Sequence, residues 1–145
     1  MLGVTVGLDG SAHSERTLAW AVAEAAVRNA PLTVLAVHEV ASNHWTGHPV
    51  IYPGDQPELE KMRLAVQELT QKAVDQAGEP GPASVTVRAV SGLPAVELIN
   101  ASRDSDLIVV GSRGGGGFAK LMLGSVSSQV VHHAHCPVAV ISGGS

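Results

Sequence analysis

Gly111-Ser112-Arg113-Gly114-Gly115-Gly116-Gly117-Phe118-Ala119-Lys120-Leu121-Met122-Leu123-Gly124-Ser125-Val126-Ser127 joins a buried strand pattern to a helix pattern. The four glycines at 114–117 let the backbone adopt φ > 0 and bring its N–H groups close to a ligand. Gly124 and Ser125 then begin a helix, whose first N–H groups lack intrahelical partners and, with the helix dipole, favour an anion. The stretch predicts a phosphate-binding loop, and the alternative is an ordinary surface loop that ends on a serine N-cap.

Two common phosphate motifs are absent from the chain. A Walker A loop needs Lys directly after its closing Gly, whereas here Ala119 precedes Lys120 and Leu121 follows it. The dinucleotide fingerprint comes after the first strand of its fold, where this chain has Gly7-Leu8-Asp9-Gly10-Ser11 instead. The glycine-rich stretch therefore belongs to a different class of phosphate site.

Outward from this stretch, strand and helix patterns alternate along the chain. Continuous apolar runs, typical of strands covered on both faces, lie at 2–8, 32–37, 84–89, 106–110 and 137–141. Apolar residues at helical spacing lie at 14–29, 62–73, from Pro94 onward and at about 125–133. Residues 41–56 show no clear period and read as a long loop. This order predicts an α/β fold with a parallel, doubly wound sheet in a single domain over 1–145, without internal repeats.

The spacing of the glycines carries a family resemblance. This spacing resembles the nucleotide-binding signature of the universal stress protein family. Two residues separate Gly111 from Gly114, and nine residues separate Gly114 from Gly124-Ser125. The resemblance extends in order and spacing over nearly the whole chain, through the segments at 4–11, 34–38, 92–95, 106–112 and 135–141. It implies an open five-stranded sheet of order 3-2-1-4-5 with helices on both faces, of the adenine nucleotide alpha hydrolase-like type. In that order Asp9 and Gly111 face each other across a crevice at the carboxyl ends of strands 1 and 4.

The resemblance also implies a nucleotide site that takes ATP, with Mg²⁺ bound through the phosphates. Backbone N–H groups of the glycine loop and helix start bind phosphate oxygens, helped by the hydroxyls of Ser125 and Ser127. The Asp9 carboxylate would repel phosphate, so it binds the ribose hydroxyls or acts through a metal ion, and the use of the matching Asp in the family favours the ribose. The main chain of Val37 meets the adenine edge. The expected nucleotide-binding residues are Asp9, Gly10, Ser11, Val37, Gly111, Ser112, Arg113, Gly114, Gly124, Ser125, Val126 and Ser127.

Simpler roles remain open for several of these residues. Asp9 can cap a turn, Ser125 can cap a helix, and Val37 can serve the core alone. Arg113 and Lys120 either reach the terminal phosphate or remain solvated loop charges. The segment at 41–56 either folds over the base, with Trp45 or Tyr52 stacked on it, or stays an unordered loop.

Composition excludes several classes of function. Nine Lys and Arg against thirteen Asp and Glu give a formal charge of −4, which argues against a nucleic-acid partner. No apolar run approaches the roughly 20 residues that cross a bilayer, so we expect no membrane partner. The single cysteine, Cys136, and the lack of a signal peptide pattern fit a cytoplasmic protein.

The residues argue against two further interpretations, a phosphatase and a zinc site. Asp9-Gly10-Ser11 resembles the end of the Asp-x-Asp-Gly-Thr motif of haloacid dehalogenase-type phosphatases, but Gly7 stands where the nucleophile would be. The run His132-His133-x-His135-Cys136 contains zinc-ligand types, yet it straddles a helix end, where histidines also suit the dipole. We therefore expect no metal ligands and no catalytic residues.

The leading hypothesis is an ATP-binding regulatory module of the stress response. The alternatives are a slow ATPase, a protein that binds AMP or cyclic AMP, and a nucleotide-free interaction protein. The last strand, at 137–141, is short and apolar with no charge, so an exposed edge there should be paired. Family members commonly dimerise through this strand, and a homodimer is the expectation.

Overall fold

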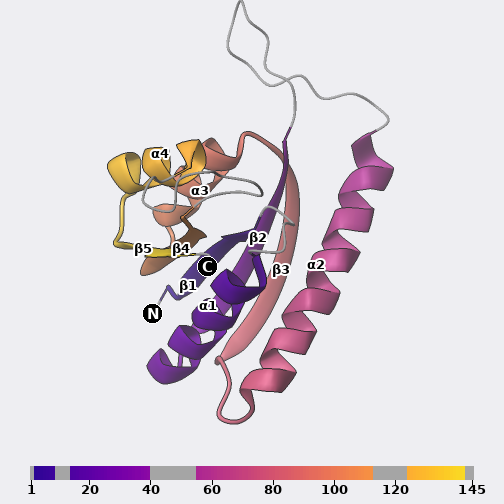
Figure 1. The fold of residues 1–145 in the computed structure, drawn as a ribbon, viewed down its shortest axis with the longest axis vertical. Coiled ribbons are helices and arrows are strands. Elements are labelled where there is room, and N and C mark those ends of the chain that lie inside the picture. Colours follow the sequence, from indigo (N-terminus) through magenta and orange to yellow (C-terminus); the bar gives the residue numbers. More distant parts are fainter. Residues whose placement is uncertain (1, 9–13, 40–54, 113–123, 143–145) are drawn as a thin grey trace, which may run out of the picture.

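The computed structural model describes residues 2–8, 14–39, 55–112 and 124–142. Strands and helices alternate through these segments, as the apolar runs predict (Figure 1). The elements are β1 (Val4–Leu8), α1 (Ser14–Arg28), β2 (Pro31–Glu39), α2 (Asp55–Ala77), β3 (Ser84–Gly92), α3 (Pro94–Ser102), β4 (Leu107–Gly111), α4 (Ser125–His133) and β5 (Val138–Ile141).

The strands form one parallel sheet in the order β3-β2-β1-β4-β5. This confirms the predicted fold class and strand order. β1 lies at the centre because its residues Val4–Leu8 are apolar or β-branched and can be covered on both faces. β3 and β5 are the two edges of the sheet.

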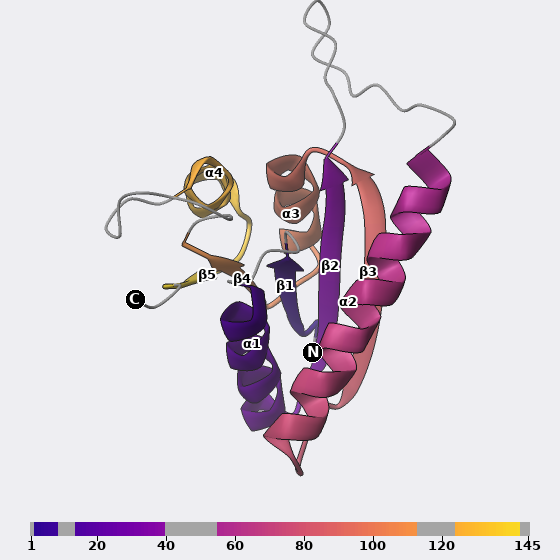
Figure 2. The same ribbon diagram turned by 45° about the vertical axis from the view of Figure 1, so that its right-hand side comes forward.

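The helices cover both faces of this sheet (Figures 1 and 2). On one face, α1 and α2 pack together, and Leu18, Val22 and Val66 lie in one apolar cluster with Val6 and Val34 of the sheet. A second cluster lies on the other face, under α3 and α4. It contains Leu35, Val37, Leu98, Ile108, Val110 and Val130. Two apolar layers therefore hold the sheet between the helix pairs.

Most element boundaries match the sequence prediction, but α2 does not. The helix begins at Asp55, so the expected loop through Gln56 is wrong at its last two residues. Pro57 lies in the first turn, where its missing N–H costs nothing and its fixed φ suits a helix. The helix ends at Ala77, and Gly78 follows with φ +77°, a conformation that glycine adopts freely.

The helices in the described segments do not include one that is long and apolar enough to span a membrane.

Candidate functional site

The carboxyl edge of the sheet is stepped around the end of β1. β1 stops at Leu8, opposite Ala36, whereas β2 continues to Glu39 alongside Gly92 of β3. On the other side, the register between β1 and β4 ends at Val6 and Val109, while β4 continues to Gly111 beside β5. β2 thus runs past the end of β1, and β1 and β4 stop pairing before either strand ends. This happens at the point where the strand order reverses, which is where open α/β sheets bind ligands.

The backbone of β4 shows which groups face this step. The N–H groups of Ile108 and Ser112 donate to the carbonyl oxygens of Pro137 and Ile141, on the β5 side. Since alternate residues of a strand direct their backbone groups to opposite neighbours, Gly111 directs its carbonyl toward β1. That carbonyl lies beyond the last register pair between β1 and β4.

The first turn of α4 is held at the same place. The N–H of Gly124, the N-cap residue, donates to the carbonyl oxygen of Ser112 with an N···O distance of 2.6 Å. The intrahelical ladder starts with the N–H of Ser128, which donates to Gly124 at 2.9 Å. The N–H groups at 125–127 precede this ladder, and among the residues that the structure describes no side chain caps the helix start. They are donors available to an anion at the carboxyl edge.

Charge separates α4 from the neighbouring helix α3. α3 carries Glu97 in its first turn and Pro94, which lacks an N–H, at its start. α4 has no acidic residue in its first turn and has His132 and His133 in its last. A helix N-terminus favours negative charge, and in α3 a carboxylate of the chain itself supplies it. The N-terminus of α4 is thus the one better suited to an external anion.

Ser127 connects the start of α4 to the end of β4. Its side chain is only 5 % exposed, and its Oγ donates a hydrogen bond to the carbonyl oxygen of Gly111. We expected this hydroxyl to bind phosphate and did not predict its bond to Gly111. A signal was available, because a small polar residue in the first turn of a helix commonly bonds nearby backbone. Which carbonyl accepts the bond depends on the folded structure and could not be predicted from the sequence.

The structure brings together part of the predicted site. Gly111 and Ser112 end β4, and the predicted residues 124–127 start α4 against them. Val37 lies just beyond the level of Leu8 in β2, and its side chain is buried in the apolar layer under α3 and α4. Other predicted residues lie outside the described part of the chain, and these are Asp9, Gly10, Ser11, Arg113 and Gly114, together with Lys120, Trp45 and Tyr52.

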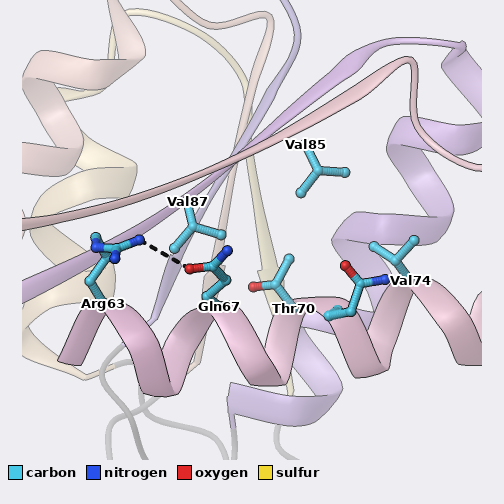
Figure 3. A pocket seen from close by; sticks show the side chains of 7 residues that line it. Arg63, Gln67, Thr70, Val74, Val85 and Val87 are labelled. Carbon is cyan, nitrogen blue, oxygen red and sulfur yellow. Dashed lines mark hydrogen bonds between the residues drawn. The ribbon is translucent and has the colours of Figure 1, made fainter. Parts of the chain in front are cut away.

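A hollow of about 200 Å³ lies elsewhere, between α2 and β3. Figure 3 shows Arg63, Gln67, Thr70 and Val74 of α2 and Val85 and Val87 of β3 around it. Arg63 donates to Gln67 at 3.0 Å and to Glu60 at 2.7 Å, so its guanidinium is engaged by its own helix. Thr70 likewise donates to the carbonyl of Val66. These polar groups stabilise α2 and point to no ligand.

The histidines near the end of α4 also have local partners. The Nδ1 of His132 lies 2.7 Å from the carbonyl oxygen of Ser128, and the backbone N–H of His135 donates to Ser102 Oγ at 2.9 Å. Within the residues that the structure describes, His, Cys, Asp and Glu side chains do not gather in threes as metal ligands would.

The chain resembles one family of known proteins over nearly its whole length. The model of the universal stress protein family matches residues 3–142. The chain belongs to the universal stress protein family. Its sequence is 39% identical over 141 residues to a universal stress protein of Mycobacterium tuberculosis and equally to one of Mycobacterium bovis. These matches cover 96% of this chain and 47% of each relative, so the chain spans about half the length of these curated relatives.

Solved structures of the family share the fold. UspA from Lactobacillus plantarum matches with a TM-score of 0.73 at 23% identity, over 95% of each chain. A universal stress protein in complex with cyclic AMP matches with a TM-score of 0.67 at 26% identity, over 97% of this chain and 96% of that one. A family member from Archaeoglobus fulgidus in complex with dAMP matches with a TM-score of 0.64 at 20% identity, over 98% of each chain. Proteins with this fold thus include binders of adenine nucleotides.

Proposed function

We propose that this chain is a nucleotide-binding regulatory unit that holds an adenine nucleotide at the stepped edge of the sheet, with the phosphates on the first turn of α4. The observation that carries the proposal is the start of α4. Its amides at 125–127 precede the helical ladder, no acidic side chain occupies its first turn, and Gly124 is fixed against Ser112 of β4. The complexes of family members with cyclic AMP and dAMP support adenine nucleotides as the ligand class.

In this proposal the nucleotide runs across the end of β1. Phosphate oxygens accept hydrogen bonds from the backbone around Gly114 and from the first turn of α4. Asp9 takes the ribose, because its carboxylate would repel phosphate, with Gly10 and Ser11 beside it. The main chain of Val37, where β2 continues past Leu8, meets the adenine edge. Mg²⁺ would be held through the phosphates of ATP, and Arg113 would lie at the terminal phosphate.

A regulatory role fits this site better than turnover. The sequence from 111 to 127 contains no Asp, Glu, His or Gln, so this stretch supplies neither a general base nor a water-positioning Gln for the γ-phosphate. The bound nucleotide would then act by stabilising one conformation or assembly, and its effect is limited by its differential affinity for the two states. A slow ATPase remains the alternative, which steady phosphate release above one per protein chain would reveal. We place this role in the cytoplasm.

A second candidate ligand is a nucleoside monophosphate. The family members solved with cyclic AMP and dAMP favour it, since each of these ligands carries a single phosphate. The two candidates differ in how much of the affinity depends on the β- and γ-phosphates. Parallel titrations with ATP, AMP and cyclic AMP separate them, because a triphosphate site binds ATP most tightly.

The proposed homodimer uses the edge strand β5. Its residues Val138–Ile141 are all half-exposed and uncharged. The opposite edge, β3, carries Arg88, an exposed charge of the kind that prevents strand pairing. Pairing with a second copy would satisfy the open backbone groups of β5.

Calorimetric titration of ATP into Gly124→Val and Gly114→Val tests the phosphate site. Side chains at these positions crowd the proposed phosphate contacts, so we expect ATP affinity to fall by at least about tenfold with the fold retained, since lost hydrogen bonds to charged groups cost roughly 1.5–3 kcal/mol each. Gly81→Val is the matched control, because a β-carbon there meets no heavy atom nearer than 4.0 Å. Unchanged affinity in both test variants would refute the assignment of phosphates to this segment.

A further inference from the structure

The hydroxyl of Ser127 faces the protein backbone. The side chain is buried, and Oγ donates its hydrogen to the carbonyl oxygen of Gly111. A serine hydroxyl has one donor hydrogen. With that hydrogen on Gly111, Ser127 has none left to donate to a phosphate oxygen.

Among the described residues, β1 offers no register partner to the acceptor carbonyl, which lies near the proposed anion site. Gly111 directs its oxygen toward β1, beyond Val6 and Val109, where the register between β1 and β4 ends. The same oxygen lies within reach of the first turn of α4, since a side chain of that turn bonds to it. A carbonyl oxygen is the negative end of its dipole and repels phosphate oxygens, and a hydrogen bond from a hydroxyl reduces this repulsion.

Ser127 also fixes the helix start relative to the strand. Gly124 bonds to the carbonyl of Ser112, and Ser127 bonds to the carbonyl of Gly111, so two consecutive carbonyls at the exit of β4 hold one turn of α4. Three residues farther along, the fully buried side chain of Val130 anchors the helix in the apolar layer beneath it. The direction of the free amides at 125–127 therefore depends on these two bonds.

We infer that Ser127 is a positioning residue for the phosphate site: its hydroxyl shields the Gly111 carbonyl and orients the amides of α4, and it does not itself bind phosphate. This inference rests on the proposed function, since the ligand that benefits is the bound nucleotide. It differs from a direct contact in one respect that can be measured. A positioning residue acts on the free protein, before any nucleotide is present.

Three variants separate the two roles. Ser127→Ala removes the hydroxyl, Ser127→Thr keeps a hydroxyl at the same position, and Ser128→Ala removes a hydroxyl from the next residue as the matched control. Circular dichroism and thermal unfolding first establish that each variant folds. If Ser127→Ala does not fold, Ser127→Cys takes its place, since the S–H group is a weaker donor of similar size.

Amide hydrogen exchange of the nucleotide-free protein is the first readout. The N–H of Ser128, which bonds to Gly124, reports on the first turn of α4. We expect its exchange, corrected for intrinsic rates, to be about tenfold faster in Ser127→Ala, because the first turn of α4 then loses one of the two hydrogen bonds that hold it to β4. Ser127→Thr and Ser128→Ala should exchange as the wild type does.

Calorimetry with ATP and adenosine is the second readout. We expect Ser127→Ala to lower ATP affinity about tenfold and to leave adenosine affinity unchanged, with Ser127→Thr restoring ATP binding. Loss of ATP affinity with unchanged exchange in the free protein would overturn the inference, since it would make the hydroxyl a direct phosphate ligand. Exchange and affinity that both stay unchanged would overturn it as well. A wild-type protein that binds neither compound would refute the proposed function, while faster exchange in Ser127→Ala would still support the positioning of α4.

Discussion

The side chain of Leu98 in α3 occupies the space in which Gly7 of β1 would carry a β-carbon. Such a carbon would lie 2.7 and 2.8 Å from the two terminal methyl carbons of Leu98. Leu98 is only 4 % exposed and lies in the apolar layer between α3, α4 and the sheet. Gly7 therefore sets how closely α3 approaches the central strand, one residue before that strand ends.

Gly7→Ala should destabilise the protein by about 1–3 kcal/mol, the usual cost of an extra methyl group in a packed interior. The free energy of unfolding in urea measures this. Gly92→Ala is the control, because its β-carbon would meet chiefly the carboxylate of Glu97, a flexible and half-exposed side chain. The cost of Gly7→Ala should shrink in a Leu98→Ala background, and equal costs in both backgrounds would show that Leu98 is not the cause.

The buried hydroxyls of Thr5 and Ser105 give a second prediction. Their oxygens lie 2.7 Å apart, and Ser105 Oγ donates to the carbonyl of Ala101 at 2.8 Å. Since Ser105 has one hydrogen, Thr5 is the donor between them. Thr5→Val should cost about 1 kcal/mol, and Ser105→Ala should cost more, about 1–3 kcal/mol, because it leaves the buried Thr5 hydroxyl without this acceptor. Chemical denaturation of both variants gives the order, and the reverse order would contradict the donor assignment.

The thiol of Cys136 should ionise at a higher pH than an ordinary thiol. Burial raises the pKa of this thiol above its ordinary value, and the nearby charge of Asp106 adds to this, against a hydrogen bond from the backbone of Ile108 that lowers the pKa. The folded protein should therefore react with iodoacetamide at pH 8 more slowly than the urea-unfolded chain does, since the thiolate is the nucleophile. Equal rates in the two states would contradict the raised pKa.

The raised pKa of the Cys136 thiol also makes the free energy of unfolding depend on pH. Both states keep the thiol protonated at low pH, whereas the unfolded thiol ionises first as the pH rises. The free energy of unfolding, relative to Cys136→Ala, should thus fall through the range in which an ordinary thiol ionises. It should be flat below that range. Urea titrations of the two proteins at several pH values measure this difference.

The open edge of β5 predicts the effect of a single proline. Ile141 and Pro137 direct their carbonyls toward β4, so Val140 directs its N–H outward. Val140→Pro removes that donor without removing a hydrogen bond to β4, which is where edge strands tolerate proline. We expect the wild type to be a dimer by gel filtration with light scattering, and Val140→Pro to be a folded monomer. A wild type that is monomeric at micromolar concentration would contradict pairing through β5.

The sequence predicted those parts of the fold that depend on local patterns. The continuous apolar run of β1 and the Gly124-Ser125 start of α4 gave both elements at or near their observed positions. The start of α2 was missed because Asp55 and Gln56 precede its apolar stripe and Pro57 looks like a helix breaker. The strand order came from the family resemblance, since periodicity does not say which strands are neighbours.

The candidate site could be predicted only in part, because local sequence patterns do not show which strands are neighbours. The glycines and serines around 111–127 indicate a phosphate site by residue type and spacing. The bond from Ser127 to Gly111 depends on which edge of β4 faces β1, a property of the assembled sheet. The roles of Asp9 and Gly114 stay predictions, since both lie outside the described residues.

Backbone amide shifts in a ¹⁵N-labelled sample, titrated with ATP and separately with adenosine, test the central claim most directly. The amides of residues 125–127 should shift strongly with ATP and little with adenosine, because they face the proposed phosphates. The amides near Val37 in β2 should shift with both compounds, because the base lies there. If ATP shifts neither group of amides, or shifts those of β2 while leaving 125–127 unchanged, the first turn of α4 is not the phosphate site.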